Sequence, residues 1–291
     1  MRFWLTIAVL LALDGSAAAQ SEPGPVGSPE GPWRAQIHWV PVDISGARYL
    51  LQTRICRPPV ETPARVAVIA HGAVDDRSAL ALPGCDQEWA RWFLDRGYVV
   101  AFGLRRGFGA TGGYYAEGGP GCGGDPDYVR IGLETARDIA AFVDYAGTLP
   151  FARPQGIVVI GASAGGWGVI AHNSLPHPRV TGFVNMAGGR GGHWEGRVNN
   201  NCRPELLIEA AGRFARTATT PMLWVYAEND SYFAPAIAEA MYGAYVQNGG
   251  RAEFRRVRAF GQDGHLLFFA RGGSQIWGPL VERYLASRPA L

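Results

Sequence analysis

The sequence predicts an α/β fold in which helices cover both faces of a mostly parallel sheet of eight strands. Short apolar runs rich in β-branched residues alternate with segments of helical periodicity, an order typical of strand–helix–strand units. With 291 residues and 47% hydrophobic content, the chain is long enough to bury one large core. Right-handed crossovers would then gather the functional loops at the carboxyl ends of the strands.

The expected elements follow one another along the chain. Residues 20–34 are rich in proline and glycine and are expected to be a linker without core-forming residues, ahead of one domain over 35–291. Strands are expected at 36–43 and 48–56, joined by a Ser45-Gly46 turn, and at 65–70, 98–104, 157–160, 180–186, 222–226 and 252–257. Helices are expected at 85–96, 128–145, directly after Ser163, and at 204–216, 234–247 and 275–287. Two glycine-rich insertions, 105–127 and 188–203, are candidates for a small lid.

Residues 1–19 are expected to be a secretory signal peptide that is removed near Ala19. A charged start is followed by a short apolar run and then by small residues. An uncleaved anchor is the alternative. Export would place the protein outside the cell or in the periplasm, where disulfides form. Four cysteines allow three pairings, of which we favour Cys122 with Cys202, one from each insertion; four buried thiols are the alternative.

Composition excludes several function classes. The net charge is +2 and no basic run is long enough for a nucleic-acid surface, so no nucleic-acid partner is expected. All 27 basic residues are arginine, which excludes a Schiff-base lysine and a phosphate-binding Walker lysine. Gly107 to Gly112 has the spacing G-x-G-x-x-G but does not lead into a helix, so we reject a dinucleotide site. The histidines are scattered singly, so no metal is expected, and the predicted chemistry needs no cofactor.

The strongest motif is Gly161-Ala162-Ser163-Ala164-Gly165, which follows an apolar strand and precedes a helix. This G-x-S-x-G pattern is typical of a nucleophile elbow, a sharp turn that exposes a reactive serine. Glycines are needed at both ends because the chain passes too close to itself for a Cβ. A glycine-rich turn with a nucleotide-binding or purely structural role is the alternative.

A serine nucleophile in such an elbow needs an acid and then a histidine later in the chain. The acid should follow the strand 222–226, where we favour Asp230 and hold Glu228 in reserve. Among six histidines, His265 alone follows both the acid and the last expected strand. We therefore predict that His265 exchanges the proton of Ser163 while Asp230 orients the imidazole.

The oxyanion formed in such a reaction needs two N–H donors. The residue after the nucleophile supplies one, Ala164, and the loop after the strand 65–70 should supply the other, which we assign to Ala73. Aromatic residues near these loops could line an acyl pocket, and the alternative is that they only pack the loops. Tyr114, Trp167 and Tyr232 are our substrate-binding candidates, and Tyr115, Trp194 and Phe233 lie in the same loops.

These residues together resemble a known family. His71-Gly72, Asp95 to Val100, Arg106 to Gly109, Gly161 to Gly166, Tyr226 to Asp230 and Gly264-His265 are spread over most of 65–270. The set resembles the dienelactone-hydrolase-like branch of the α/β-hydrolases, which is similar to the catalytic domains of prolyl-oligopeptidase-type serine peptidases. The resemblance implies an α/β-hydrolase fold with small loop insertions. Dienelactone hydrolases proper use a cysteine where this chain has Ser163, and this difference favours a serine esterase.

The sequence therefore predicts a secreted or periplasmic serine hydrolase that cleaves small-molecule esters through an acyl-enzyme. No membrane association is expected after the signal peptide is removed. A peptidase or amidase of the prolyl-oligopeptidase type is one alternative, although no propeller domain is expected before the catalytic region. A non-catalytic binding protein on the same fold is the other.

Overall fold

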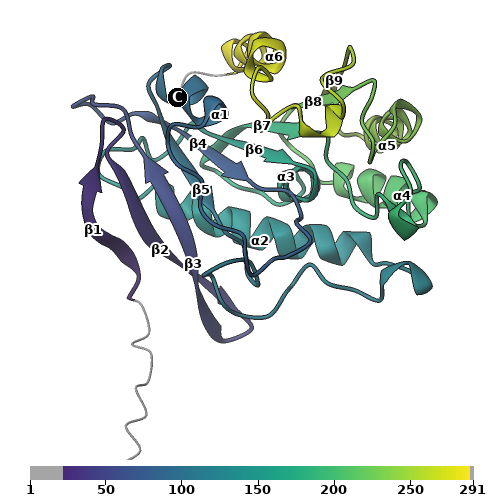
Figure 1. Cartoon of the computed structure of the whole chain (residues 1–291), viewed down its shortest axis with the longest axis horizontal. Helices are drawn as coiled ribbons and strands as arrows, with labels where there is room; N and C mark the ends of the chain where they lie inside the picture. Colours follow the sequence, from purple (N-terminus) through teal and green to yellow (C-terminus); the bar gives the residue numbers. More distant parts are fainter. Residues whose placement is uncertain (1–21, 289–291) are drawn as a thin grey trace, which may run out of the picture.

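A computed structural model describes residues 22–288, and the expected signal peptide, 1–19, lies outside them. Nine strands of this part of the chain form one sheet in the order β1-β2-β3-β5-β4-β6-β7-β8-β9 (Figure 1). The strands are β1 Gly24–Glu30, β2 Ala35–Ile44, β3 Ala47–Cys56, β4 Arg65–Ala70, β5 Tyr98–Gly103, β6 Ile157–Ala162, β7 Val180–Met186, β8 Met222–Ala227 and β9 Ala252–Val257. The predicted α/β class and mostly parallel sheet are confirmed.

The sheet changes from antiparallel to parallel at β5. β1, β2 and β3 pair antiparallel, β3 pairs antiparallel with β5, and every later pairing is parallel. Ser45 and Gly46 join β2 to β3 with φ values of 50° and 84°, as a tight hairpin turn requires. Because β4, β6, β7 and β8 are parallel neighbours, the loops that follow them meet at one edge of the sheet.

Helices cover both faces of the sheet (Figure 1). On one face lie α1 Glu88–Leu94 and α6 Ser274–Ala286, and on the other lie α2 Tyr128–Ala146, α3 Ala164–Asn173, α4 Pro204–Ala215 and α5 Pro235–Gln247. Three short 3₁₀ helices, η1 Gly121–Gly123, η2 Trp194–Gly196 and η3 Gly264–Leu266, lie in the loops. Alternate residues of β4 divide between the two cores: Val66 and Val68 face α2, whereas Ala67 and Ile69 face α1.

The first strand was not expected. Part of the segment predicted as a linker pairs with β2 as β1, which makes nine strands in place of eight. β1 is an edge strand and nearly all of its residues are exposed, so Pro25 and Pro29 cost it no inner ladder bonds. Backbone pairing with β2 attaches β1, and Trp33, near the end of the same segment, packs partly buried against the core on the α1 side of the sheet.

Two disulfides cross-link the loops, and all four cysteines are paired. Cys122–Cys202 joins the two insertions, as predicted, and Cys56–Cys85 joins the end of β3 to the loop before α1. Both insertions are largely irregular. None of the helices between residues 22 and 288 is long and apolar enough to cross a membrane.

Candidate active site

Ser163 lies at the turn between β6 and α3, with φ 54° and ψ −122°. A residue other than glycine keeps such a conformation only where the surrounding structure holds it. The neighbouring glycines show how tight the turn is. A Cβ on Gly161 would lie 2.3 Å from Gly165 O, and a Cβ on Gly165 would lie 2.3 Å from Ala70 O. The strand–turn–helix geometry that the G-x-S-x-G pattern predicts is therefore present.

Asp230 and His265 form a hydrogen-bonded pair although they are 35 residues apart in the chain. Nδ1 of His265 lies 3.0 Å from Oδ1 and 3.1 Å from Oδ2 of Asp230. The Asp230 side chain is fully buried, and that of His265 is 7% exposed. A carboxylate only accepts hydrogen bonds, so the ring proton belongs on Nδ1 and the basic nitrogen of the neutral ring is Nε2.

Backbone contacts hold both members of this pair. Oδ1 of Asp230 accepts hydrogen bonds from the N–H groups of Tyr232 and Phe233, each at 2.8 Å. Oδ1 of Asp263 accepts from the N–H of His265 at 2.9 Å. Each carboxylate thus orders its own loop, and Asp263 also joins the two loops, because its Oδ1 accepts a hydrogen bond from the N–H of Ser231 at 3.0 Å. Glu228, the reserve candidate, is exposed, and its Oε1 lies 3.9 Å from Nε of Arg256. It therefore takes no part in the pair.

The predicted oxyanion donors lie on either side of the serine. Ala164 is the first residue of α3, where backbone N–H groups have no partner within the helix. On the other side, a Cβ on Gly72 would lie 3.2 Å from Cβ and 3.7 Å from Oγ of Ser163. Gly72 therefore lies against the side chain of Ser163. Within the described part of the chain, no backbone carbonyl accepts a hydrogen bond from the Ala73 N–H.

Ser163 and His265 line the same cleft, of about 780 Å³, at the carboxyl edge of the sheet. One part of its wall is apolar and comes mainly from the loop after β4, α1 and η3. This apolar wall consists of Leu80, Pro83, Trp89, Phe102, Leu266 and Phe269. Its aromatic rings touch one another, with centroids 5.4 Å apart for Trp89–Phe102 and 5.5 Å for Trp89–Phe269.

Two of the three predicted substrate-binding residues lie elsewhere. Trp167 belongs to α3 and is completely buried, and its Nε1–H donates a hydrogen bond to Tyr128 O of α2 at 2.9 Å. Tyr114 is half exposed outside the cleft, and its hydroxyl accepts a hydrogen bond from Arg106. Trp167 is part of the core because α3 turns that face onto α2. Tyr232 does line the cleft, and its ring stacks on His265 with centroids 4.2 Å apart.

His193 is a cleft residue that sequence reasoning passed over. It precedes Asp230 in the chain, so the expected order of acid and then histidine excludes it as the base. In the structure its ring stacks on that of Tyr232 with centroids 3.6 Å apart. Tyr232 therefore lies between the imidazoles of His193 and His265. Nε2 of His193 also lies 3.0 Å from Oγ of Ser231, which donates to Asp263 at 2.6 Å. Residue order points to candidates for the acid and the base. It does not show which residues of an insertion fold over the site.

The apolar wall was also missed, because Trp89 and Phe102 belong to regular elements whose aromatic residues look like core. Both are almost fully buried, although they line the cleft. In the described part of the chain, no three His, Cys, Asp or Glu side chains are grouped so that they could hold a metal ion.

No protein-family model matches the chain, and no curated protein matches it by sequence. Its fold is nevertheless shared by solved structures. A protein from Klebsiella pneumoniae assigned as a dienelactone hydrolase is 13% identical, with a TM-score of 0.58 over 87% of this chain and 98% of that chain. Acetyl xylan esterase 1 from Thermoanaerobacterium sp. JW/SL YS485 is 16% identical, with a TM-score of 0.57 over 91% of this chain and 88% of that one.

A third similar structure is dipeptidyl peptidase 4 from Porphyromonas gingivalis, at 18% identity and a TM-score of 0.61. The match covers 87% of this chain but 36% of the peptidase. At these identities the likeness concerns the fold. The chain has the α/β-hydrolase fold, and the resemblance noted in its sequence is confirmed at that level.

Proposed function

We propose that this protein is a serine hydrolase that cleaves ester bonds, with Ser163 as nucleophile, His265 as general base and Asp230 as the residue that orients it. The observation that carries the proposal is the buried Asp230–His265 hydrogen bond at a cleft that Ser163 also lines. The strained backbone of Ser163 supports it, because such strain persists where a reactive group must be presented.

The proton transfers follow from this arrangement. Nε2 of His265 takes the proton of Ser163 as Oγ attacks the ester carbonyl, and the imidazolium is stabilised by Asp230. The proton then passes to the departing alcohol, which leaves an acyl-enzyme on Ser163. Water repeats the sequence and releases the acid. The N–H groups of Ala73 and Ala164 stabilise the oxyanion in both halves of the reaction.

The cleft favours an uncharged substrate with an apolar group. Among the described residues that line it, Asp75 is the one side chain with a full charge, and no arginine is present although the protein has 27 basic residues. An anionic substrate would meet a carboxylate and no counter-charge. The rings of Trp89, Phe102 and Phe269 offer an apolar surface on which an aliphatic or aromatic group of the ester can lie.

We also propose that the protein works outside the cytoplasm. The signal-like residues 1–19 and two disulfides both favour an oxidising compartment.

Turnover of p-nitrophenyl esters of increasing acyl length by the wild type and by Ser163→Ala tests the proposal. The wild type should hydrolyse them and be labelled by a fluorophosphonate, whereas Ser163→Ala should do neither. Equal turnover by both proteins would contradict the mechanism. Faster turnover of aminoacyl anilides than of esters would point to a peptidase, and absence of labelling would point to a binding protein.

A further inference from the structure

The peptide that carries the proposed oxyanion donor Ala73 is held in place by a buried histidine. Nδ1 of His71 lies 2.7 Å from the carbonyl oxygen of Gly72. That carbonyl and the Ala73 N–H belong to one planar trans peptide, so they point in opposite directions along fixed lines. A hydrogen bond that fixes Gly72 O therefore also fixes the direction of the Ala73 N–H.

The hydrogen bonds of His71 define its tautomer. Nδ1 must carry the proton because its partner is a carbonyl, and Nε2 must be bare because the N–H of Arg105 donates to it at 3.3 Å. The ring is 3% exposed. Burial, followed by the positive charge of Arg105, lowers the pKa of His71 to about 3, so the ring stays neutral at ordinary pH.

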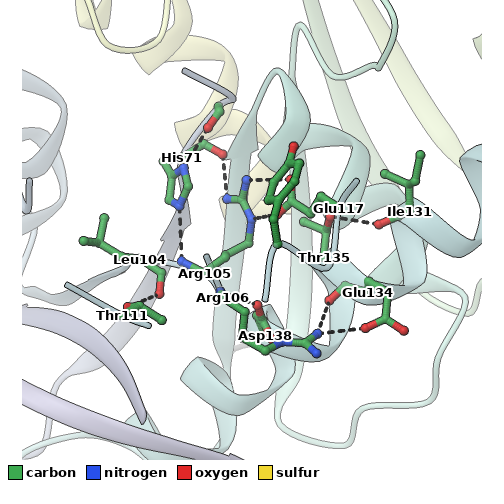
Figure 2. Close-up of polar contacts among 12 residues, drawn as sticks. His71, Leu104, Arg105, Arg106, Thr111, Glu117, Ile131, Glu134, Thr135 and Asp138 are labelled. Carbon is green, nitrogen blue, oxygen red and sulfur yellow. Dashed lines mark hydrogen bonds and ion pairs between the residues drawn. The ribbon is translucent and has the colours of Figure 1, made fainter. Parts of the chain in front are cut away.

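The preceding peptide is held as well, by the guanidinium of Arg105. Nη1 of Arg105 donates to His71 O at 2.7 Å, and its Nε donates to the carboxylate of Glu117 (Figure 2). Both peptides that flank Gly72 are thus fixed by side chains. Gly72 needs this support. It has little room for a Cβ beside Ser163, and a glycine backbone is the freest of all to rotate.

The support continues into both insertions. Glu117 also accepts from Nη1 of Arg190 at 2.9 Å, which joins the insertion 105–127 to the insertion 188–203. Arg106 anchors the backbone beside Arg105 to α2, since its N and Nε donate to Asp138 at 2.8 and 2.7 Å (Figure 2). Arg105 and Arg106 are completely buried.

We propose that His71 is a positioning residue of the oxyanion hole: its Nδ1–H aims the Ala73 N–H at the reacting carbonyl, and the Arg105–Glu117–Arg190 cluster holds His71 in place. This inference rests on the proposed function. Burying three charges is costly, and replacing such clusters by apolar residues is often neutral or stabilising. Stability alone therefore does not explain the cluster. A need to hold the backbone beside Ser163 in one exact geometry would explain it.

The test compares two replacements of His71 that keep different halves of the ring. In His71→Asn the amide nitrogen takes the place of Nδ1 and can still donate to Gly72 O. In His71→Gln the amide oxygen takes the place of Nε2 and can accept from Arg105, but no donor is left for Gly72 O. Both variants lose the packing of the imidazole ring, including its edge-on contact with Phe108, whose ring centroid lies 4.6 Å away. A role in packing alone would therefore affect them equally.

We expect His71→Gln to lower kcat for an ester by up to about 10²–10³-fold, the cost of losing one oxyanion donor. KM should change little, and the inhibition constant of an alkyl boronic acid, which forms a tetrahedral adduct, should rise with the loss of kcat. His71→Asn should keep most of kcat at a similar melting temperature. Equal kcat values for the two variants would overturn the inference.

A measurement on the wild type covers the case in which neither variant folds. The ¹⁵N chemical shifts of the His71 ring should show a proton on Nδ1 and none on Nε2, and the opposite tautomer would overturn the inference. Turnover by Ser163→Ala separates the two levels of the argument. If that variant remains active, the proposed function fails, whereas an inactive Ser163→Ala with equal His71 variants rejects only the positioning role.

Discussion

The imidazole of His265 lies with Nδ1 3.0 Å from Oδ1 of Asp230, in a pair that is almost fully closed to solvent. Burial strengthens this hydrogen bond, because water has little access to compete for the carboxylate. The same oxygen accepts from two backbone N–H groups, so the carboxylate cannot rotate away.

Asp230→Asn should therefore lower kcat by about 10⁴-fold with little change in the melting temperature. Asparagine has the shape of aspartate and its Oδ1 can still accept from Tyr232 N, but it stabilises no imidazolium. Glu228→Gln is the matched control, because Glu228 is exposed on the same loop, and it should leave kcat unchanged. Steady-state kinetics of both variants on one ester is the measurement. A loss in Glu228→Gln comparable to that in Asp230→Asn would reject the assignment of the acid.

Gly165→Ala should destabilise the fold, because its Cβ would lie 2.3 Å from Ala70 O and 2.5 Å from His71 O. We expect a loss of about 1–3 kcal/mol or more in the free energy of unfolding, since backbone atoms cannot move aside cheaply. Gly243→Ala in α5 is the control, because its Cβ would meet nothing within 4 Å. That variant should gain about 0.5–1 kcal/mol from helix propensity. Urea denaturation measures both, and a neutral Gly165→Ala would mean that the elbow is looser than described.

Phe269→Ala should change which esters are preferred. The ring is half buried, lines the cleft and packs edge-on against Trp89. We expect the ratio of kcat/KM for an ester with a bulky apolar group to that for the acetate to fall by about 10-fold or more. A ratio taken within one variant cancels any loss of folded protein. Tyr114→Ala, outside the cleft, should leave the ratio unchanged. An unchanged ratio in Phe269→Ala would place the apolar group of the substrate elsewhere.

Glu117 should make the protein sensitive to acid. Burial raises the pKa of Glu117, but Arg105 and Arg190 outweigh it and lower the pKa to about 2, from 4.5 for a free carboxyl. A carboxyl whose pKa is lower in the folded state stabilises the fold above its unfolded pKa, and this stability is lost as pH falls from about 4.5 toward 2. The loss should be roughly 3 kcal/mol, visible in melting temperatures taken from pH 6 to 2.

The control for this acid sensitivity is Glu239→Gln, because Glu239 forms an exposed pair with Arg256. Its pH profile should match that of the wild type. Glu117→Gln should be less stable at neutral pH, since it leaves two buried arginines without their carboxylate, and its profile should be flatter in acid. A steep acid transition retained by Glu117→Gln would assign the effect to another carboxyl.

Much of the fold could be read from local patterns. The apolar runs predicted every strand from β2 to β9, and helical periodicity predicted α2 within one residue of its end at Ala146. β1 escaped because an exposed edge strand leaves no apolar alternation in the sequence. Trp167 was predicted to bind substrate but is buried in the core. The sequence around it does not show which face of α3 meets α2.

The class of fold, the strand-to-helix turn at Ser163 and the order in which Asp230 and His265 follow it could all be predicted from the residues alone. These depend on periodicity, on glycine at sites with no room for a Cβ, and on residue order, all of which are local or linear. Three contacts became visible in the folded chain: His193 stacks on Tyr232, Trp89 and Phe269 form a wall of the cleft, and His71 holds the Gly72 carbonyl. Such contacts join residues far apart or depend on the direction of a single peptide, and no spacing in the sequence records either.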